Sequence, residues 1–78
     1  MTEQDYKFYL NEGIDKTNQG KFEEALEVLE KALQLNPQNA LIYFSKAIAY
    51  HNLNRLRAEC ENYDKAIKLD NKIACALL

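Results

Sequence analysis

The chain has 78 residues, of which 47% are hydrophobic and 28% charged, and its formal net charge is −2. A chain of this length forms one small domain, and its slightly acidic balance argues against nucleic acid or an anionic membrane surface as a partner. Charged residues interrupt the first ten positions, and no apolar run approaches the roughly 18 residues of a membrane helix. The sequence therefore predicts a cytoplasmic domain with neither a signal peptide nor a membrane span.

Helical periodicity begins near the N-terminus and predicts two helices in the first half of the chain. Apolar residues recur at spacings of three and four over 6–17 and again over 21–35, which places them on one face of each helix. Asn18-Gln19-Gly20 separates the two segments, and glycine commonly ends a helix. Asn36-Pro37 ends the second helix, because the residue before a proline avoids the α region.

The same periodicity continues in the second half and predicts three further helices. The segment 40–52 is apolar on most of its circumference and should be the most enclosed element, a fourth helix follows at 55–69, and a fifth begins at 72–78. The expected fold class is all-α. Asp70-Asn71 makes a poor helix interior, so we expect a break there, although an uninterrupted helix over 55–78 stays open as an alternative.

The helix breaks recur at a fixed interval, because the spacing from Gly20 to Asn54 equals the spacing from Asn36 to Asp70. Aligning 6–39 on 40–73 leaves seven identities, and many other substitutions keep the character of the side chain. The identical pairs are Tyr9/Tyr43, Ile14/Ile48, Asn18/Asn52, Glu27/Glu61, Lys31/Lys65, Ala32/Ala66 and Leu35/Leu69. The sequence is therefore an internal repeat of a helix–turn–helix unit, and residues that align in this way are called repeat mates below.

A unit of this kind and length resembles the tetratricopeptide repeat. The likeness rests on Gly13, on Ala25 followed by Leu29, on Pro37, and on the helix end KALQLNPQNA. It implies a single domain over 1–78 in which antiparallel helix–turn–helix pairs stack as a short right-handed solenoid. The implied units are repeat one at 6–39, repeat two at 40–73 and a partial third-repeat or capping helix at 72–78.

Three positions depart from the family pattern. Lys16 stands where an aromatic side chain is usual, which predicts a loosely closed first pair, and Asn71 replaces a proline. Glu59 stands where a small alanine is usual. Either the fourth helix is displaced at its start, or Glu59 turns outward and its two neighbours supply the close contact.

The resemblance implies that the first helix of each pair lines a concave groove. The groove residues that it assigns are Lys7 and Thr17, together with nine expected partner contacts: Leu10, Asn11, Ile14, Leu41, Phe44, Ser45, Ile48, His51 and Asn52. The apolar members would form a strip rimmed by polar groups, and a monomer rarely leaves such a strip bare. Either a partner binds there, or a further helix of the same chain or a second copy covers the strip. The family subtype that grips a C-terminal carboxylate is not expected, because Leu10, Ile14, Ser45 and Cys75 occupy its matching positions.

These features predict a non-catalytic module for a protein or peptide partner. The module would bind a peptide or a helix of that partner in an apolar groove. The alternative is a structural role in which the chain self-associates into a homo-oligomer, through end stacking at its C-terminal edge or through helix exchange. Repeat one carries a net charge of −2 and repeat two +2, which is compatible with head-to-tail stacking. No nucleic acid and no membrane are expected as partners.

Side chains for catalysis are scarce. His51 is the only histidine and has no recognisable triad partners. Cys60 and Cys75 lie in apolar-periodic stretches rather than at metal-ligand spacings, so we expect two reduced thiols that are buried or half-buried. The sequence therefore predicts no enzyme, no cofactor and no metal site.

Overall fold

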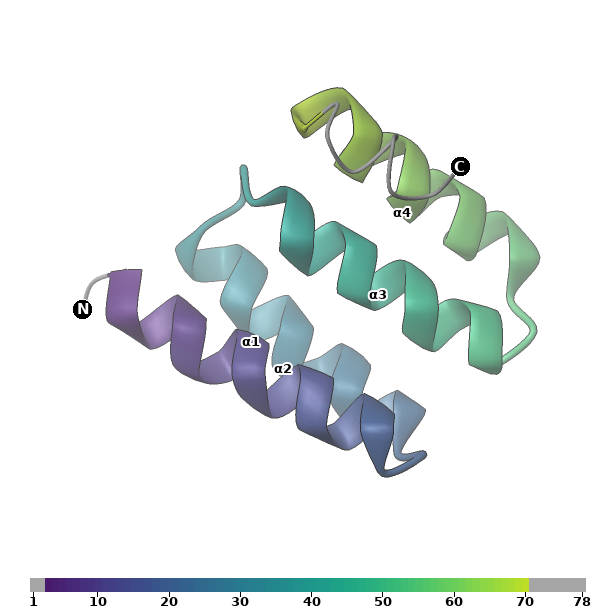
Figure 1. Ribbon diagram of the computed structural model, residues 1–78, viewed down its shortest axis with the longest axis horizontal. Helices are drawn as coiled ribbons and strands as arrows, with labels where there is room; N and C mark the ends of the chain where they lie inside the picture. Colours follow the sequence, from purple (N-terminus) through teal and green to yellow (C-terminus); the bar gives the residue numbers. More distant parts are fainter. Residues whose placement is uncertain (1–2, 71–78) are drawn as a thin grey trace.

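The computed structural model describes residues 3–70, with side chains from residue 6 onward. It contains α1 (Glu3–Asn18), α2 (Phe22–Leu35), α3 (Ala40–Asn52) and α4 (Leu56–Leu69), and no strand over that range. The helices pair as α1 with α2 and α3 with α4, and α3 also packs on α2 and α1 (Figure 1). The expected all-α architecture of helix–turn–helix pairs is confirmed. The fifth helix expected at 72–78, together with Cys75, lies outside the described residues.

The second helices of the two repeats end with the same geometry, at aligned positions. Asn36 follows α2 with φ −147° and donates its N–H to the carbonyl of Ala32, while Asp70 follows α4 with φ −151° and donates to Ala66. The extended backbone at Asp70 ends α4 at Leu69. The alternative of one uninterrupted helix over 55–78 is therefore wrong, even though Asp70 is not followed by proline.

The turns within the two helix pairs are also repeats of one another. Gly20 has φ +82° and Asn54 has φ +61°, both in the left-handed region, which glycine adopts most readily and asparagine tolerates. The amide of the next residue then reaches back five positions, from Lys21 to Lys16 and from Arg55 to Tyr50. This is the hydrogen bond of a Schellman helix end, so one turn type reverses the chain in both repeats.

Asn39 starts α3 and so joins the two repeats. Its side-chain oxygen accepts hydrogen bonds from the amides of Leu41 at 2.9 Å and Ile42 at 3.3 Å, which satisfies two of the free donors at the start of the helix. Tyr43 donates its hydroxyl back to the carbonyl of Pro37 at 3.3 Å. The short connection between α2 and α3 is therefore fixed by hydrogen bonds at Pro37 and at Asn39.

Small residues bring the helices of each pair together. Ala25, Ala32, Ala47 and Ala66 are fully buried. A Cβ added to Gly13 would lie 2.5 Å from Cδ2 of Leu29, so α1 and α2 approach at a point where only glycine fits. The core cluster that results contains Leu10, Leu29, Ala32 and Ile42. As expected, α3 is the most enclosed helix in the described part of the chain, with five buried residues against four in α2 and two in α4.

Charged side chains add contacts between helices. The Lys31 ammonium lies 5.8 Å from the centroid of the Tyr9 ring, and its repeat mate Lys65 lies 5.5 Å from that of Tyr43. Lys16 forms an ion pair with Glu24 at 3.1 Å. The first pair is therefore tied near its turn by charge, where the resemblance assigns an aromatic side chain.

Two sequence expectations for α4 need correction. Glu59 does not turn outward, because its carboxylate lies 3.1 Å from Nδ1 of His51 and its side chain is only 15% exposed. Cys60 is exposed rather than buried or half-buried, because it lies on a face of α4 that no other described helix covers. Helical periodicity cannot show which of two apolar faces has a neighbour.

Candidate functional site

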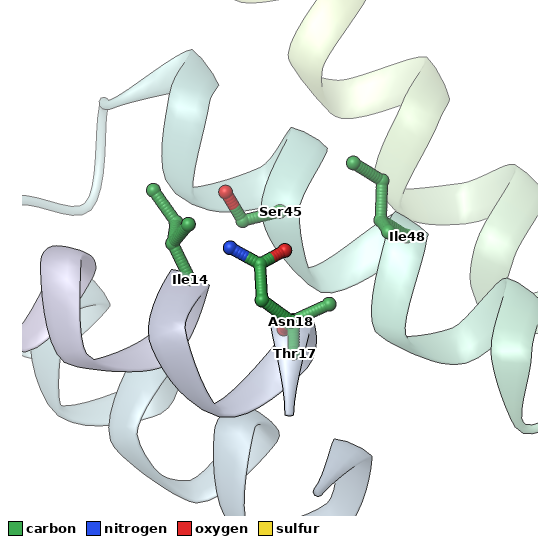
Figure 2. A pocket seen from close by; sticks show the side chains of 5 residues that line it. All are labelled: Ile14, Thr17, Asn18, Ser45 and Ile48. Atoms are coloured by element: carbon green, nitrogen blue, oxygen red, sulfur yellow. The ribbon is translucent and has the colours of Figure 1, made fainter. Parts of the chain in front are cut away.

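A small hollow lies between the first helices of the two repeats. Its lining residues are Ile14, Thr17 and Asn18 from α1 and Ser45 and Ile48 from α3, and its volume is about 90 Å³ (Figure 2). The two isoleucines are repeat mates. All five side chains are uncharged, so the hollow favours apolar and neutral polar groups.

The polar side chains of the hollow differ in what they already bind. The Thr17 hydroxyl donates to the carbonyl of Gly13 at 2.9 Å, one turn earlier in α1. The side-chain amide of Asn18 and the side-chain hydroxyl of Ser45 make no hydrogen bond to any other residue of 3–70. In Figure 2 the Asn18 amide lies between the two helices, near Ser45. Two polar groups are therefore available to a bound molecule beside an apolar wall.

The structure brings three of the nine expected groove residues together in the hollow, namely Ile14, Ser45 and Ile48. Leu41, which is 55% exposed, lies one helical turn before Ser45 on the same face of α3. Asn11 is exposed one turn before Ile14 on α1. These five residues, with Thr17 and Asn18, form what we call the α1–α3 face.

The other four expected residues are engaged elsewhere. Leu10 is only 8% exposed and belongs to the core cluster with Ile42, so its side chain is not offered to a partner. Phe44 packs its ring against Tyr63, with the centroids 5.7 Å apart. His51 faces the Glu59 carboxylate. Asn52 donates its amide to the carbonyl of Ile48 at 2.9 Å, so it stabilises the end of its own helix.

Tyr63 shows the electrostatics of the α3–α4 pair. Burial first, and then the nearby Glu59 carboxylate, raise the pKa of the Tyr63 hydroxyl above its ordinary value of 10.0. Both causes disfavour the phenolate. Tyr63 therefore stays neutral at physiological pH and serves as a packing residue against Phe44.

Catalytic and metal chemistry find no support in the described residues. Over 3–70, no three or more His, Cys, Asp or Glu side chains are grouped so that they could hold a metal ion. Within the same range, no helix has the length and apolar character needed to cross a membrane. The α1–α3 face, where the expected groove residues Ile14, Ser45 and Ile48 meet, is a candidate site in the described part of the chain.

Asn18 is the site residue that sequence reasoning missed. Its repeat mate Asn52, also an asparagine, was expected in the groove. That identity was the available signal. The repeats nevertheless use these asparagines differently, because Asn18 has the neighbouring helix α3 beside it whereas Asn52 donates its side-chain amide to the Ile48 carbonyl of its own helix.

Comparisons with known proteins bear on the family. A model of the TPR repeat matches residues 16–54, and a model of the tetratricopeptide repeat matches residues 40–73. An uncharacterised protein of Methanocaldococcus jannaschii is 30% identical over 67 residues, which are 86% of this chain and 78% of that protein. No solved structure matches the chain at a comparable level of significance.

Larger proteins also share the repeat. The Hsp70-Hsp90 organising protein of Plasmodium falciparum is 36% identical over 56 residues, covering 72% of this chain and 9% of that protein. Human serine/threonine-protein phosphatase 5 is 38% identical over 56 residues, covering 65% of this chain and 10% of that protein. The chain thus spans about a tenth of each of these two relatives. It belongs to the tetratricopeptide-repeat family, whose repeats are generally non-catalytic protein-interaction modules.

Proposed function

We propose that the α1–α3 face binds a segment of a protein partner by taking one of its aliphatic side chains into the hollow. The observation that carries the proposal is the hollow itself, with Ile14 and Ile48 on its walls and, beside them, two polar groups that make no hydrogen bond within residues 3–70. The hollow has a volume of about 90 Å³ and an apolar wall, which suits the insertion of an aliphatic side chain.

The polar groups suit a peptide main chain. The Asn18 amide offers both donors and an acceptor, and the Ser45 hydroxyl offers a donor, so together they can bind a peptide carbonyl and amide on either side of the inserted side chain. Leu41 and Asn11 extend the same face along both helices. A bound segment would therefore cross α1 and α3 rather than follow one helix alone.

The expected affinity is modest. Burial of one aliphatic side chain contributes about 1.5–3 kcal/mol, and each net hydrogen bond adds about 0.5–1.5 kcal/mol. Contact with exposed Leu41 adds to this, whereas ordering the peptide opposes it. We expect dissociation constants from about 10 µM to 1 mM.

A peptide-display experiment tests the proposal. A phage library of random dodecapeptides is panned on the full chain. The selected peptides, here called winners, are labelled with fluorescein, and their dissociation constants are measured by fluorescence polarisation. Ile14→Glu and Leu41→Glu each place a charge on the α1–α3 face without disturbing the core, and we expect binding to weaken by about tenfold or more. Winners should carry an aliphatic residue as the essential anchor.

Phe8→Glu is the matched control, because Phe8 is another large, exposed apolar residue of a first helix, at 64% exposure, and lies outside the hollow. It should leave binding unchanged, and circular dichroism should show the same helix content for all variants. Winners that bind the Ile14→Glu and Leu41→Glu variants as well as the original chain would overturn the assignment. So would a library without any binder tighter than about 1 mM.

A further inference from the structure

The two repeats serve as controls for each other, because each has the same internal packing but a neighbour on a different side. Ile42 of α3 is fully buried, whereas its repeat mate Phe8 on α1 is 64% exposed. Ala49 is also fully buried, whereas its mate Asp15 is exposed. Ile42 is therefore buried by the preceding repeat, whose Leu10 and Leu29 share its core cluster, and Ala49 lies on the same face of α3.

The surface of repeat one that receives α3 can be identified from its contacts. Ile42 joins a cluster with Leu10 and Leu29, against which Leu33 also packs. Lys46, one turn after Ile42, is buried and binds the Glu30 carboxylate of α2 with its ammonium group. α3 thus packs an aliphatic side chain and a cation against repeat one, and the small, buried Ala49 lies on the same face of the helix.

Repeat two carries the corresponding surface at the aligned positions. The mates of the receiving residues are Phe44, Tyr63, Asp64 and Ile67, which we call the trailing surface. Its three apolar members are only partly buried, and the Asp64 side chain is 62% exposed. In Figure 1, α3 lies between α4 and the α1–α2 pair. No described helix occupies this side of α4 as α3 occupies α2.

We propose that the trailing surface binds an amphipathic helix of another protein that repeats the α3 pattern. That pattern is an aliphatic residue, Lys or Arg four positions later, and Ala or Gly seven positions later, as in Ile42, Lys46 and Ala49. These spacings lie on one helix face. The cation pairs with the Asp64 carboxylate, and the small residue allows close approach of the helices.

Charge selects this occupant. In the chain alone, Asp64 holds Lys68 at 3.2 Å in an ion pair whose side chains are both exposed, and such surface pairs contribute little. A cation of the bound helix that lies beside Phe44 and Ile67 is less screened by water than Lys68. It therefore displaces Lys68 from the Asp64 carboxylate.

A second copy of the chain does not meet these requirements. Its open first helix presents Phe8, Glu12 and Asp15 at the positions of Ile42, Lys46 and Ala49. Glu12 would approach the like charge of Asp64, and Asp15 would lose its water where α3 has a fully buried methyl group, which is costly for a carboxylate. Head-to-tail stacking of identical copies, the arrangement that builds filaments, is therefore disfavoured.

The first experiment uses the α3 sequence as the probe helix. A fluorescein-labelled peptide of residues 39–54 carries a hydrocarbon staple between positions 44 and 51, on the face opposite Lys46. It should bind the full chain, and a Lys46→Glu version should bind at least about tenfold more weakly. Asp64→Lys in the chain should reverse this preference.

Glu61→Lys is the control on the same helix, because Glu27, its repeat mate on α2, stays exposed although repeat two packs on α2. This change should leave the preference for the original peptide over its Lys46→Glu version unchanged. Dependence on Asp64 also separates this site from displacement of the chain's own α3, which would depend on Glu30. Absence of peptide binding, or equal binding of both peptides to the Asp64→Lys chain, would overturn the proposal.

The second experiment changes the chain itself. Glu12→Lys with Asp15→Ala gives α1 the cation and the small residue of the α3 pattern, with the large apolar Phe8 in the place of Ile42. We expect the original chain to sediment as a monomer and the double variant to form concentration-dependent oligomers, which a further Asp64→Lys change abolishes. Head-to-tail oligomers of the original chain would refute the selection by charge, and so would a strictly monomeric double variant.

Discussion

Gly13→Ala is the most informative single substitution for the packing of repeat one. In an exposed helix interior this change stabilises a protein by about 1 kcal/mol, because alanine has the higher helix propensity. Here the added Cβ would lie 2.5 Å from Cδ2 and 2.6 Å from Cγ of Leu29. Two carbon atoms pack at about 3.5–4.0 Å, so Leu29 would have to move by about 1 Å.

Leu29 has nowhere to move without disturbing its neighbours. It is fully buried and belongs to the core cluster with Leu10, Ala32 and Ile42. Overpacking of this kind costs about 1–3 kcal/mol, which exceeds the gain in helix propensity. The net expectation is a loss of about 1 kcal/mol in the free energy of unfolding, and a melting temperature lower by about 4–8 °C.

Urea unfolding followed by far-UV circular dichroism measures this loss, with an unchanged m-value as the sign that the denatured state is the same. Ala47→Gly is the matched control, because Ala47 is the repeat mate of Gly13 and is fully buried. Removal of its methyl group should also destabilise, by about 1–2 kcal/mol. If Gly13→Ala instead stabilises the chain by about 1 kcal/mol, the close approach of α1 and α2 is refuted.

Three other predictions follow from single contacts. Asn39→Ala removes the cap of α3 and should cost about 1 kcal/mol in urea unfolding; no change would exclude a role for that cap. Asn54→Gly should stabilise by a few tenths to about 1 kcal/mol, because Asn54 has φ +61° and its mate Gly20 already uses glycine there; a loss of stability would contradict this. The raised pKa of Tyr63 means that the folded state holds this proton more tightly than the unfolded state. Stability should therefore fall as pH rises from about 10, and by less in Tyr63→Phe; equal slopes for both chains in urea titrations at high pH would refute the effect of burial and Glu59.

The candidate site could be predicted only in part from the sequence. The repeat assigned Ile14 and Ile48 to equivalent positions, and the structure brings both into one hollow. It assigned Leu10 and Phe44 in the same way, but Leu10 is in the core whereas Phe44 packs on Tyr63. Equivalent positions differ because repeat one has a repeat after it, whereas repeat two has a repeat before it.

Local physics explains what the sequence determined by itself. Apolar spacing specifies the helices, the turn residues Gly20 and Asn54 specify where α1 and α3 end, and the cap Asn39 specifies where α3 begins. All of these act over a few neighbouring residues, so they could be identified without a structure. The regular recurrence of the helix breaks then specified helix pairs of one kind, and hence the family.

Contacts between residues that are far apart in the sequence decided which side chains are buried and which charges are paired. Lys46 and Glu12 occupy equivalent positions, yet only Lys46 is buried and paired, because α2 lies beside α3 and no described helix lies beside α1 on that side. Cys60 and Leu26 are likewise equivalent, yet Cys60 is exposed and Leu26 is not. Burial depends on which surfaces meet in space, and a repeated sequence encodes the same surface twice whether or not a partner covers it.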